Sequence, residues 1–179
     1  MKREIYLSVD VEATGPIPGK YSMLSLGACV VGDPADTYYA ELKPISREFI
    51  PEALKVSGLD MDDLEKTGIP PAIAMADFAK WIEAKAGANR PVFVGLGAPF
   101  DWQFINWYFH SFLGRNPFGH GGIDIKAYYM GLTGVPWSET VASKLPDWIK
   151  PEAALSHHAL ADAQAQATIF AKLLARSET

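Results

Sequence analysis

Ile5-Tyr6-Leu7-Ser8-Val9-Asp10-Val11-Glu12 is the stretch that decides the fold, because its odd positions are all apolar and its even positions are mostly polar. Side chains alternate between the two faces of a strand, so this pattern predicts a strand with Asp10 and Glu12 on the same face. Two carboxylates this close repel each other and resist ionising together unless a cation lies between them. A half-exposed strand whose acids face water would show the same pattern, so this pair alone does not define a site.

Two later acids, Asp101 and Asp162, each begin an apolar helical stripe. The positions 4, 7 and 11 residues further on are Ile105, Tyr108 and Phe112 after Asp101, and Gln166, Ile169 and Leu173 after Asp162. An unpaired charge on such a face is costly, whereas the dipole at the start of a helix favours negative charge. The alternative for each is a simple N-terminal helix charge.

The remaining hydrophobic pattern predicts three early strands followed by alternating helices and strands. The predicted strands are Ile5 to Glu12, Ser22 to Val31, Thr37 to Leu42, Val92 to Val94 and Gly122 to Asp124; the predicted helices are short ones within Pro51 to Lys66, then Pro71 to Ala86, Asp101 to Leu113, one ending at Gly131, and His158 to Arg176. This order indicates an α/β fold, a mixed sheet flanked by helices, in a single domain over residues 1–179. Asp124, at the end of the last strand, is interpreted first as a helix cap and second as an auxiliary acid.

Three motifs give the chain a family resemblance. They are SVDVEATGP at residues 8–16, PVFVGLGAPFDWQF at 91–104 and SHHALADAQAQA at 156–167. Together they resemble the histidine-containing (DEDDh) branch of the DEDD superfamily of 3′-to-5′ exonucleases, which includes ribonuclease T, oligoribonuclease and the proofreading subunit of bacterial replicative polymerase. The resemblance covers nearly the whole chain and implies the ribonuclease H-like fold.

The resemblance implies a catalytic site of Asp10, Glu12, Asp101, His157 and Asp162. The four acids would bind two Mg²⁺ or Mn²⁺ ions, for which carboxylate oxygens are suitable ligands. The implied reaction is hydrolysis of phosphodiester bonds at the 3′ end of single-stranded RNA or DNA, with release of nucleoside 5′-monophosphates. A histidine whose pKa lies near neutrality would accept the proton of the attacking water.

The choice of histidine depends on which argument is used. Helical spacing alone favours His158, which precedes Asp162 by four residues and would share its helix face. In the family the histidine precedes the acid by five residues and lies on the loop that enters the helix, which favours His157. We therefore assign His157 as the base and His158 as its neighbour.

Substrate contacts are expected next to the first two motifs. The resemblance implies them at Ala13, Thr14 and Gly15. Trp102 lies about 100° from Asp101 on an ideal helical wheel, so it could stack on a base or cover the sheet. Gly97 departs from the family, since many members carry Asn four residues before the second-motif Asp. It could allow close approach of a nucleotide, although a turn between strand and helix is the favoured interpretation.

The composition indicates a soluble protein that does not coat nucleic acid. The 179 residues are 49% hydrophobic and carry a net charge of −5, whereas domains that bind nucleic acid non-specifically are usually basic. The sequence begins with no signal-peptide pattern, and no stretch is long enough to span a membrane. Because Cys29 is the single cysteine, no intramolecular disulfide can form and a reducing, cytoplasmic setting is expected. The resemblance is compatible with a homodimer, since members of the family often dimerise, although no interface stripe is identifiable in this sequence.

Two other function classes were weighed. One is a nucleic-acid-binding module that keeps the fold without catalysis, which would have no physical need for clustered carboxylates. The other is a metal-dependent phosphohydrolase of small nucleotides, which would differ from an exonuclease by cutting mononucleotides rather than trinucleotides.

Overall fold

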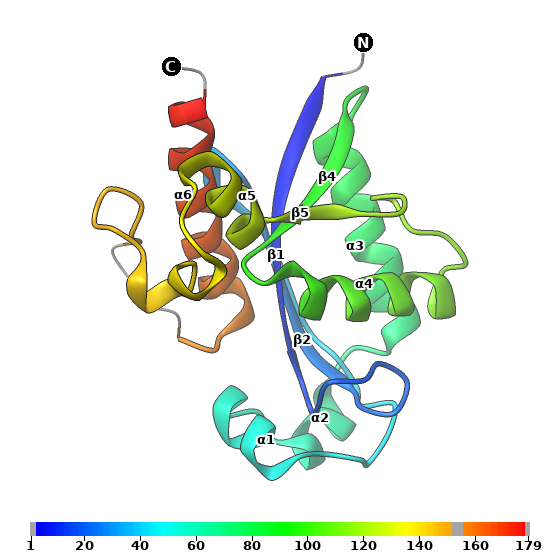
Figure 1. Cartoon of the computed structure of the whole chain (residues 1–179). Coiled ribbons are helices and arrows are strands. Elements are labelled where there is room, and N and C mark those ends of the chain that lie inside the picture. Colours follow the sequence, from blue (N-terminus) through cyan, green and yellow to red (C-terminus); the bar gives the residue numbers. More distant parts are fainter. Residues whose placement is uncertain (1–2, 152–155, 178–179) are drawn as a thin grey trace.

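The computed structural model describes residues 3–151 and 156–177 and contains a five-stranded mixed sheet in the order β3-β2-β1-β4-β5 (Figure 1). The strands are β1 (Glu4–Ala13), β2 (Met23–Val30), β3 (Asp33–Glu41), β4 (Arg90–Gly95) and β5 (Gly122–Asp124). The β1-β2 and β2-β3 pairs are antiparallel, while β1-β4 and β4-β5 are parallel. The predicted fold class is confirmed.

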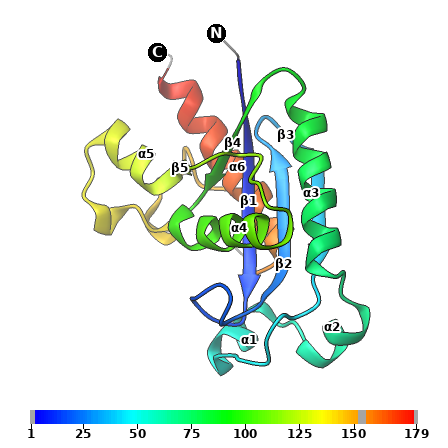
Figure 2. The same ribbon diagram turned by 90° about the vertical axis from the view of Figure 1, so that its right-hand side faces the viewer.

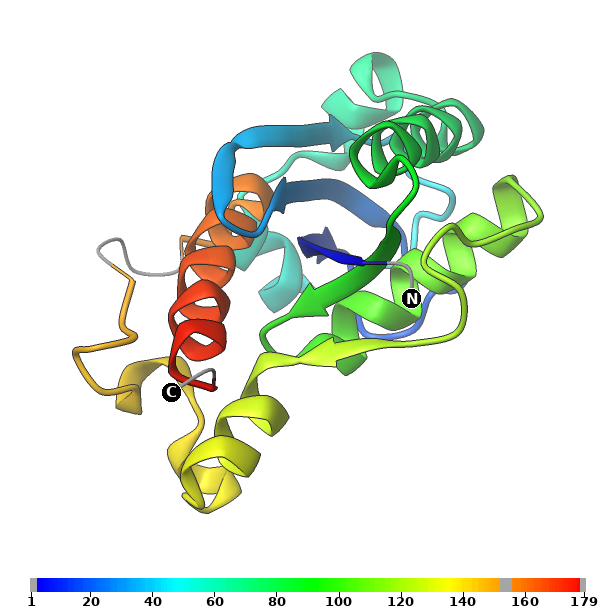
Figure 3. The same cartoon turned by 90° about the horizontal axis from the view of Figure 1, so that it is seen from above.

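Helices cover both faces of this sheet. They are α1 (Pro51–Ser57), α2 (Met61–Thr67), α3 (Pro71–Ala86), α4 (Ala98–Phe112), α5 (Ile125–Thr133) and α6 (Ala159–Ser177), with short 3₁₀ helices η1 (Trp137–Glu139) and η2 (Ala142–Lys144). Figures 2 and 3 show α3 and α4 on one side of the sheet and α6 on the other. In the part of the chain that the structure describes, no helix is long and apolar enough to cross a membrane.

The alternation in β1 divides the core between the two faces. Leu7, Val9 and Val11 are buried in the cluster that also contains residues of α3 and α4. On the opposite face α6 packs very close to the sheet at Gly27, which has no side chain. A Cβ at this position would lie 2.3 Å from the backbone of Ala159. The even-numbered residues of β1, including the two acids, therefore lie on the face of the sheet that α6 covers.

Most predicted elements are found, with shifted ends. The helix Pro71–Ala86 and the strand Gly122–Asp124 match the prediction. The helix α4 begins at Ala98, three residues earlier than predicted, because Gly97 caps it with a left-handed backbone (φ +85°) and Pro99 fits its first turn. Asp124 caps α5 as predicted, since its Oδ1 accepts the N–H of Ala127 at 2.8 Å.

A crevice forms because β1 extends beyond the end of its neighbour β4. The parallel pairing with β4 ends at Ser8, opposite Val94, whereas β1 continues to Ala13. Beyond this point the first turn of α4 lies against β1, and the backbone N–H of Val11 donates to Asp101 Oδ1 at 3.1 Å. In open α/β sheets, ligands bind at the carboxyl ends of strands where neighbouring connections diverge.

Candidate active site

Five sequence-predicted residues line one cavity of about 310 Å³ at this crevice. The strand β1 supplies Asp10 and Glu12, α4 supplies Asp101, and Asp162 and His157 come from α6 and the loop before it. The wall is completed by Val11, Ala13, Ala53, Val56, Leu96, Gly97, Phe100 and Gln166. Residues 152 positions apart in the chain (10 to 162) are thus brought to one surface.

Asp101 and Asp162 are the two buried acids of the cavity. The side chain of Asp101 is only 5% exposed, and its Oδ1 accepts the N–H of Val11. Burial is the main reason that the pKa of Asp101 is raised to about 8, and the charges of Glu12 and Asp124 act in the same direction. Asp124 therefore influences the site electrostatically although it does not line this cavity.

The two acids of β1 resist ionisation for the same reason. Burial raises the pKa of Asp10 well above its ordinary value, and the nearby charges of Asp101 and Glu12 raise it further. Burial also raises the pKa of Glu12 to about 7, with a smaller contribution from the charge of Asp162. Near neutral pH the cluster therefore holds protons that bound cations would displace.

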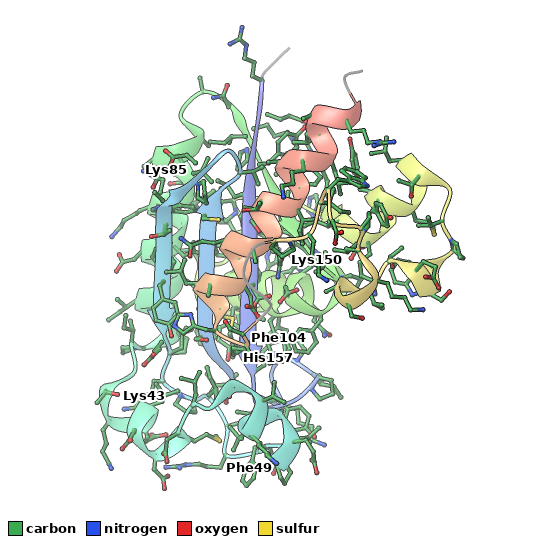
Figure 4. All side chains as sticks on the ribbon, turned by 90° about the vertical axis from the view of Figure 1, so that its left-hand side faces the viewer. Lys43, Phe49, Lys85, Phe104, Lys150 and His157 are labelled. Atoms are coloured by element: carbon green, nitrogen blue, oxygen red, sulfur yellow. The ribbon has the colours of Figure 1, made fainter. Side chains whose placement is uncertain are left out.

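Asp162 holds the loop that carries the histidine. Its carboxylate accepts the N–H of Ser156 at 2.7 Å, the hydroxyl of Ser156 at 3.2 Å and the N–H of His157 at 3.0 Å. These bonds stabilise His157 in the left-handed region (φ +57°), the one described non-glycine residue with positive φ. Figure 4 places His157 just below the start of α6, on the side toward α1. Backbone strain of this kind is concentrated at functional sites.

The neighbouring histidine points elsewhere. The ring of His158 stacks on Tyr39 of β3, with centroids 4.9 Å apart and planes 16° from parallel. His158 precedes the first helical residue, Ala159, so the helical spacing that favoured it does not apply. Of the two histidines, His157 lines the cavity and His158 does not, and the role of His157 as the base stays a prediction.

The donor set fits divalent cations. One ligand atom each from Glu12, His157 and Asp162 lies within 4.8 Å of the others. Asp10 and Asp101 add two further carboxylates to the same cavity. Hard oxygen donors at this density suit Mg²⁺ or Mn²⁺, and their raised pKa values reflect repulsion and desolvation that a cation would offset.

Metal and pH are expected to act together on stability. Because the folded pKa values of Glu12 and Asp101 lie at about 7 and about 8, above their ordinary values of 4.5 and 3.8, the stability that these groups contribute is complete below about pH 4. It is lost as the pH rises through 7 to 8. In chelator the melting temperature should therefore fall over this range, while Mn²⁺ at about 100 times its Kd should raise it by about 5–10 °C at pH 8.

Differential scanning calorimetry at pH 5.5 and pH 8, with Mn²⁺ and with chelator, measures this coupling. The rise caused by Mn²⁺ should be smaller at pH 5.5, since protons then compete with the cation for the carboxylates. An equal rise at both pH values would contradict the description of the cluster.

The strained backbone at His157 predicts an unusual glycine effect. His157→Gly and His157→Ala both remove the imidazole, but glycine adopts φ +57° without steric cost. His157→Gly should be more stable than His157→Ala by about 1 kcal/mol in urea unfolding. Equal stabilities would show that the loop relaxes to an ordinary conformation.

Of the three residues that follow Glu12 in the first motif, Ala13 is the one that lines the cavity. The Thr14 hydroxyl donates to the carbonyl of Glu48 at 2.8 Å and accepts the N–H of Ser22 at 3.0 Å. The Thr14 carbonyl accepts the N–H of Ile50, the residue before α1. Gly15 is required by packing, because a Cβ there would lie 2.6 Å from the ring of Tyr21. Thr14 therefore fixes α1 beside the cavity.

Trp102 has a packing position. Its ring meets Phe93 edge-on with centroids 5.2 Å apart, and it lines a separate pocket with Asp124 and Gly122. Among the described residues it is not part of the wall around the acids. Of the two alternatives for Trp102, covering the sheet is the one that its contacts match.

Several residues of the cavity wall were not predicted from the sequence. Phe100 and Val56 are 40% and 49% exposed and lie on α4 and α1. Gln166, only 2% exposed, donates to Asp10 and accepts from the N–H of Leu96. The position of Gln166 on the buried stripe after Asp162 was the available signal, whereas nothing local in the sequence places α1 beside β1.

Comparisons with known proteins identify the family of this chain. The exonuclease family model RNase_T matches residues 7–170. The 3′-5′ DNA exonuclease Cap18 of Escherichia coli is 48% identical over 169 residues, which cover 94% of this chain and 90% of that protein.

Solved structures share the fold at low identity. The nuclease domain of 3′hExo, a DEDDh family member bound to rAMP, has a TM-score of 0.75 at 17% identity over 96% of this chain and 92% of its own. Exonuclease I of E. coli in complex with a dT13 oligonucleotide has a TM-score of 0.69 at 18% identity, over 96% of this chain and 41% of its own. With the family model and Cap18, they confirm the resemblance found in the three motifs: this chain belongs to the RNase_T family of exonucleases.

Proposed function

We propose that this protein is a metal-dependent 3′-5′ exonuclease that acts on single-stranded DNA and releases nucleoside 5′-monophosphates. The observation that carries the proposal is the convergence of four carboxylates and His157 on one cavity of about 310 Å³. The choice of DNA rests on the 48% identity to a DNA exonuclease.

The four acids would bind two Mg²⁺ or Mn²⁺ ions, for which carboxylate oxygens are suitable ligands. When bound, these ions stabilise negative charge on the attacking and leaving oxygens of an in-line displacement. Asp101 and Asp162 are held rigidly by backbone N–H groups of Val11, Ser156 and His157. This rigidity fixes the ligand positions before substrate arrives.

His157 would act as the general base. Its exposed imidazole lines the cavity, and the carboxylate of Asp162 holds its backbone N–H at 3.0 Å. The imidazole takes one proton from water as the water oxygen bonds to phosphorus. The bond from phosphorus to the 3′ oxygen of the preceding nucleotide then breaks, which leaves a 3′-hydroxyl on the shortened strand after that oxygen is protonated.

Apolar side chains at the cavity rim would receive the terminal base. Phe100 and Val56 present exposed surfaces from opposite elements, α4 and α1. Stacking on an aromatic ring contributes about 1–3 kcal/mol per base, so Phe100→Ala should raise KM by about 10-fold or more with a smaller change in kcat. Steady-state kinetics on a short oligonucleotide measure both constants. Ile73→Ala, which changes another exposed apolar residue, on α3 and outside this cavity, is the matched control and should leave both constants unchanged.

The choice of sugar is tested with matched strands. A 5′-labelled DNA and an RNA of the same sequence are compared by kcat/KM, with Mg²⁺ and with Mn²⁺. We expect the DNA to be the better substrate. A higher kcat/KM for RNA would overturn the choice of DNA without affecting the assignment of the catalytic residues, and cleavage of mononucleotides alone would favour a small-nucleotide phosphohydrolase.

A homodimer and a cytoplasmic location stay predictions. The first follows from the family resemblance and the second from the single cysteine, Cys29, which is buried. Light scattering of the purified protein measures the first, and fractionation of cells measures the second.

A further inference from the structure

Gln166 links α6 to β1 and to the loop that precedes α4. It lies on α6, one turn after Asp162, and is 2% exposed. Its Nε2 donates to Asp10 Oδ1 at 2.6 Å, and its Oε1 accepts the N–H of Leu96 at 2.9 Å. The amide group of this α6 residue therefore bonds both to β1 and to the loop between β4 and α4.

The direction of this amide is fixed by its partners. The backbone N–H of Leu96 can only donate, so it must face Oε1. The amino group of Gln166 is then directed at Asp10, where its donor matches an acceptor oxygen. A flipped amide would place two donors together at Leu96. Asp10 Oδ1 thus has a fixed partner, while Oδ2 stays available to bind a cation.

We propose that Gln166 is a positioning residue that orients the Asp10 carboxylate for divalent-cation binding and holds the Leu96–Gly97 wall of the same cavity. The inference rests on the proposed function. It assigns Gln166 no contact with the reacting atoms. Residues that orient a metal ligand from behind typically change metal affinity 10- to 100-fold when they are replaced.

If Gln166 only stabilised the fold, its hydrogen bond with Leu96 would be sufficient, but Gln166 makes a second one with Asp10. The half-buried N–H of Leu96 needs one acceptor, which Oε1 of Gln166 supplies. The second bond, at 2.6 Å to a carboxylate that lines the cavity, adds nothing to that requirement. The two roles therefore differ in their effect on cation affinity rather than in their effect on folding.

The same helix offers a matched control. Gln164 is two residues away, and its Nε2 donates to the carbonyl of Pro34 at 2.7 Å, outside the cavity. Gln164→Met and Gln166→Met each remove one glutamine amide from α6 and keep a side chain of similar length. Only the second change removes a hydrogen bond to a cavity carboxylate.

Mn²⁺ binding to the metal-free protein is measured by isothermal titration calorimetry, and the Mn²⁺ concentration for half-maximal cleavage of a DNA oligonucleotide is measured in parallel. For Gln166→Met we expect the Kd for Mn²⁺ and the half-maximal Mn²⁺ concentration each to rise about 10- to 100-fold. For Gln164→Met we expect both quantities to equal those of the wild type. A Mn²⁺ affinity of Gln166→Met within about twofold of wild type would overturn the inference.

Loss of stability does not obscure the result. For each variant, the melting temperature with Mn²⁺ is compared with that of the same variant without it. This difference reports Mn²⁺ binding even if Gln166→Met has a lower melting temperature than the wild type. Gln166→Asn is the second variant, and its side chain is one methylene too short to reach both Asp10 and Leu96. It should bind Mn²⁺ as weakly as Gln166→Met does. Wild-type protein that binds Mn²⁺ and leaves DNA intact would contradict the proposed function instead, because the titration contains no substrate.

Discussion

Replacing Asp10 with asparagine is expected to lower kcat/KM by on the order of 10⁴-fold, the scale on which removal of one member of a catalytic group acts in other hydrolases. The same substitution should raise the melting temperature of the metal-free protein at pH 8 by a few degrees. Burial and the charges of Asp101 and Glu12 oppose ionisation of Asp10, so the neutral amide removes a cost that the folded protein bears at this pH.

Asp10→Asn removes the negative charge of this side chain without removing its hydrogen bond. The carbonyl oxygen of asparagine can accept the Gln166 amide as Asp10 Oδ1 does, so the hydrogen bond at 2.6 Å is retained while the charge is lost. Activity and stability should therefore move in opposite directions. In the presence of saturating Mn²⁺ the wild type should be the more stable of the two, because it binds the cation more tightly.

Asp77→Asn is the matched control, since Asp77 is an exposed acid of α3 that pairs with Lys80 at 3.0 Å. Its kcat/KM should equal that of the wild type. Calorimetry in chelator and initial rates on labelled DNA measure the two effects. Full activity in Asp10→Asn, or a lower metal-free melting temperature at pH 8, would contradict the description of the carboxylate cluster.

The second large effect is expected at His157. His157→Ala should lower kcat by about 10²- to 10⁴-fold, the usual contribution of a positioned acid-base group, with little change in Mn²⁺ affinity if the four acids bind the cations. His158→Ala should change kcat by less than about threefold, because its ring stacks on Tyr39 of β3. The pair therefore separates the residue in the cavity from its neighbour in the chain.

Rates measured from pH 6 to pH 9 at saturating metal test the role of the imidazole. The pH dependence of the rate should differ between the wild type and His157→Ala, since a general base acts only when it is unprotonated. Equal losses in the two variants, or a pH profile unchanged by His157→Ala, would show that this imidazole is not the base.

The strands and helices were predictable where a local pattern specifies them. The alternation from Ile5 to Glu12 placed both acids of β1 on one face, and the stripe after Asp162 placed that acid at the start of α6. The three motifs identified the family before any geometry was known. These features depend on neighbours within one turn or one strand, which a sequence contains directly.

The parts that were not predictable depend on distant contacts. The start of α4 at Ala98 depends on the left-handed Gly97, a conformation that the sequence permits without requiring. The cavity wall from α1 depends on Thr14, whose carbonyl accepts the N–H of Ile50, 36 positions along the chain. Trp102 was ambiguous on the helical wheel because its contact with Phe93 depends on where the helix lies on the sheet.

The most direct test is a product time course on 5′-labelled single-stranded DNA, for wild type and Asp10→Asn, with Mn²⁺ and with chelator. The account predicts a ladder that shortens one nucleotide at a time from the 3′ end, releases nucleoside 5′-monophosphates, and disappears both in chelator and in Asp10→Asn. A ladder that persists in chelator, internal fragments without 3′ shortening, or full activity in Asp10→Asn would contradict the assignment of this cavity as a metal-dependent 3′-5′ exonuclease centre.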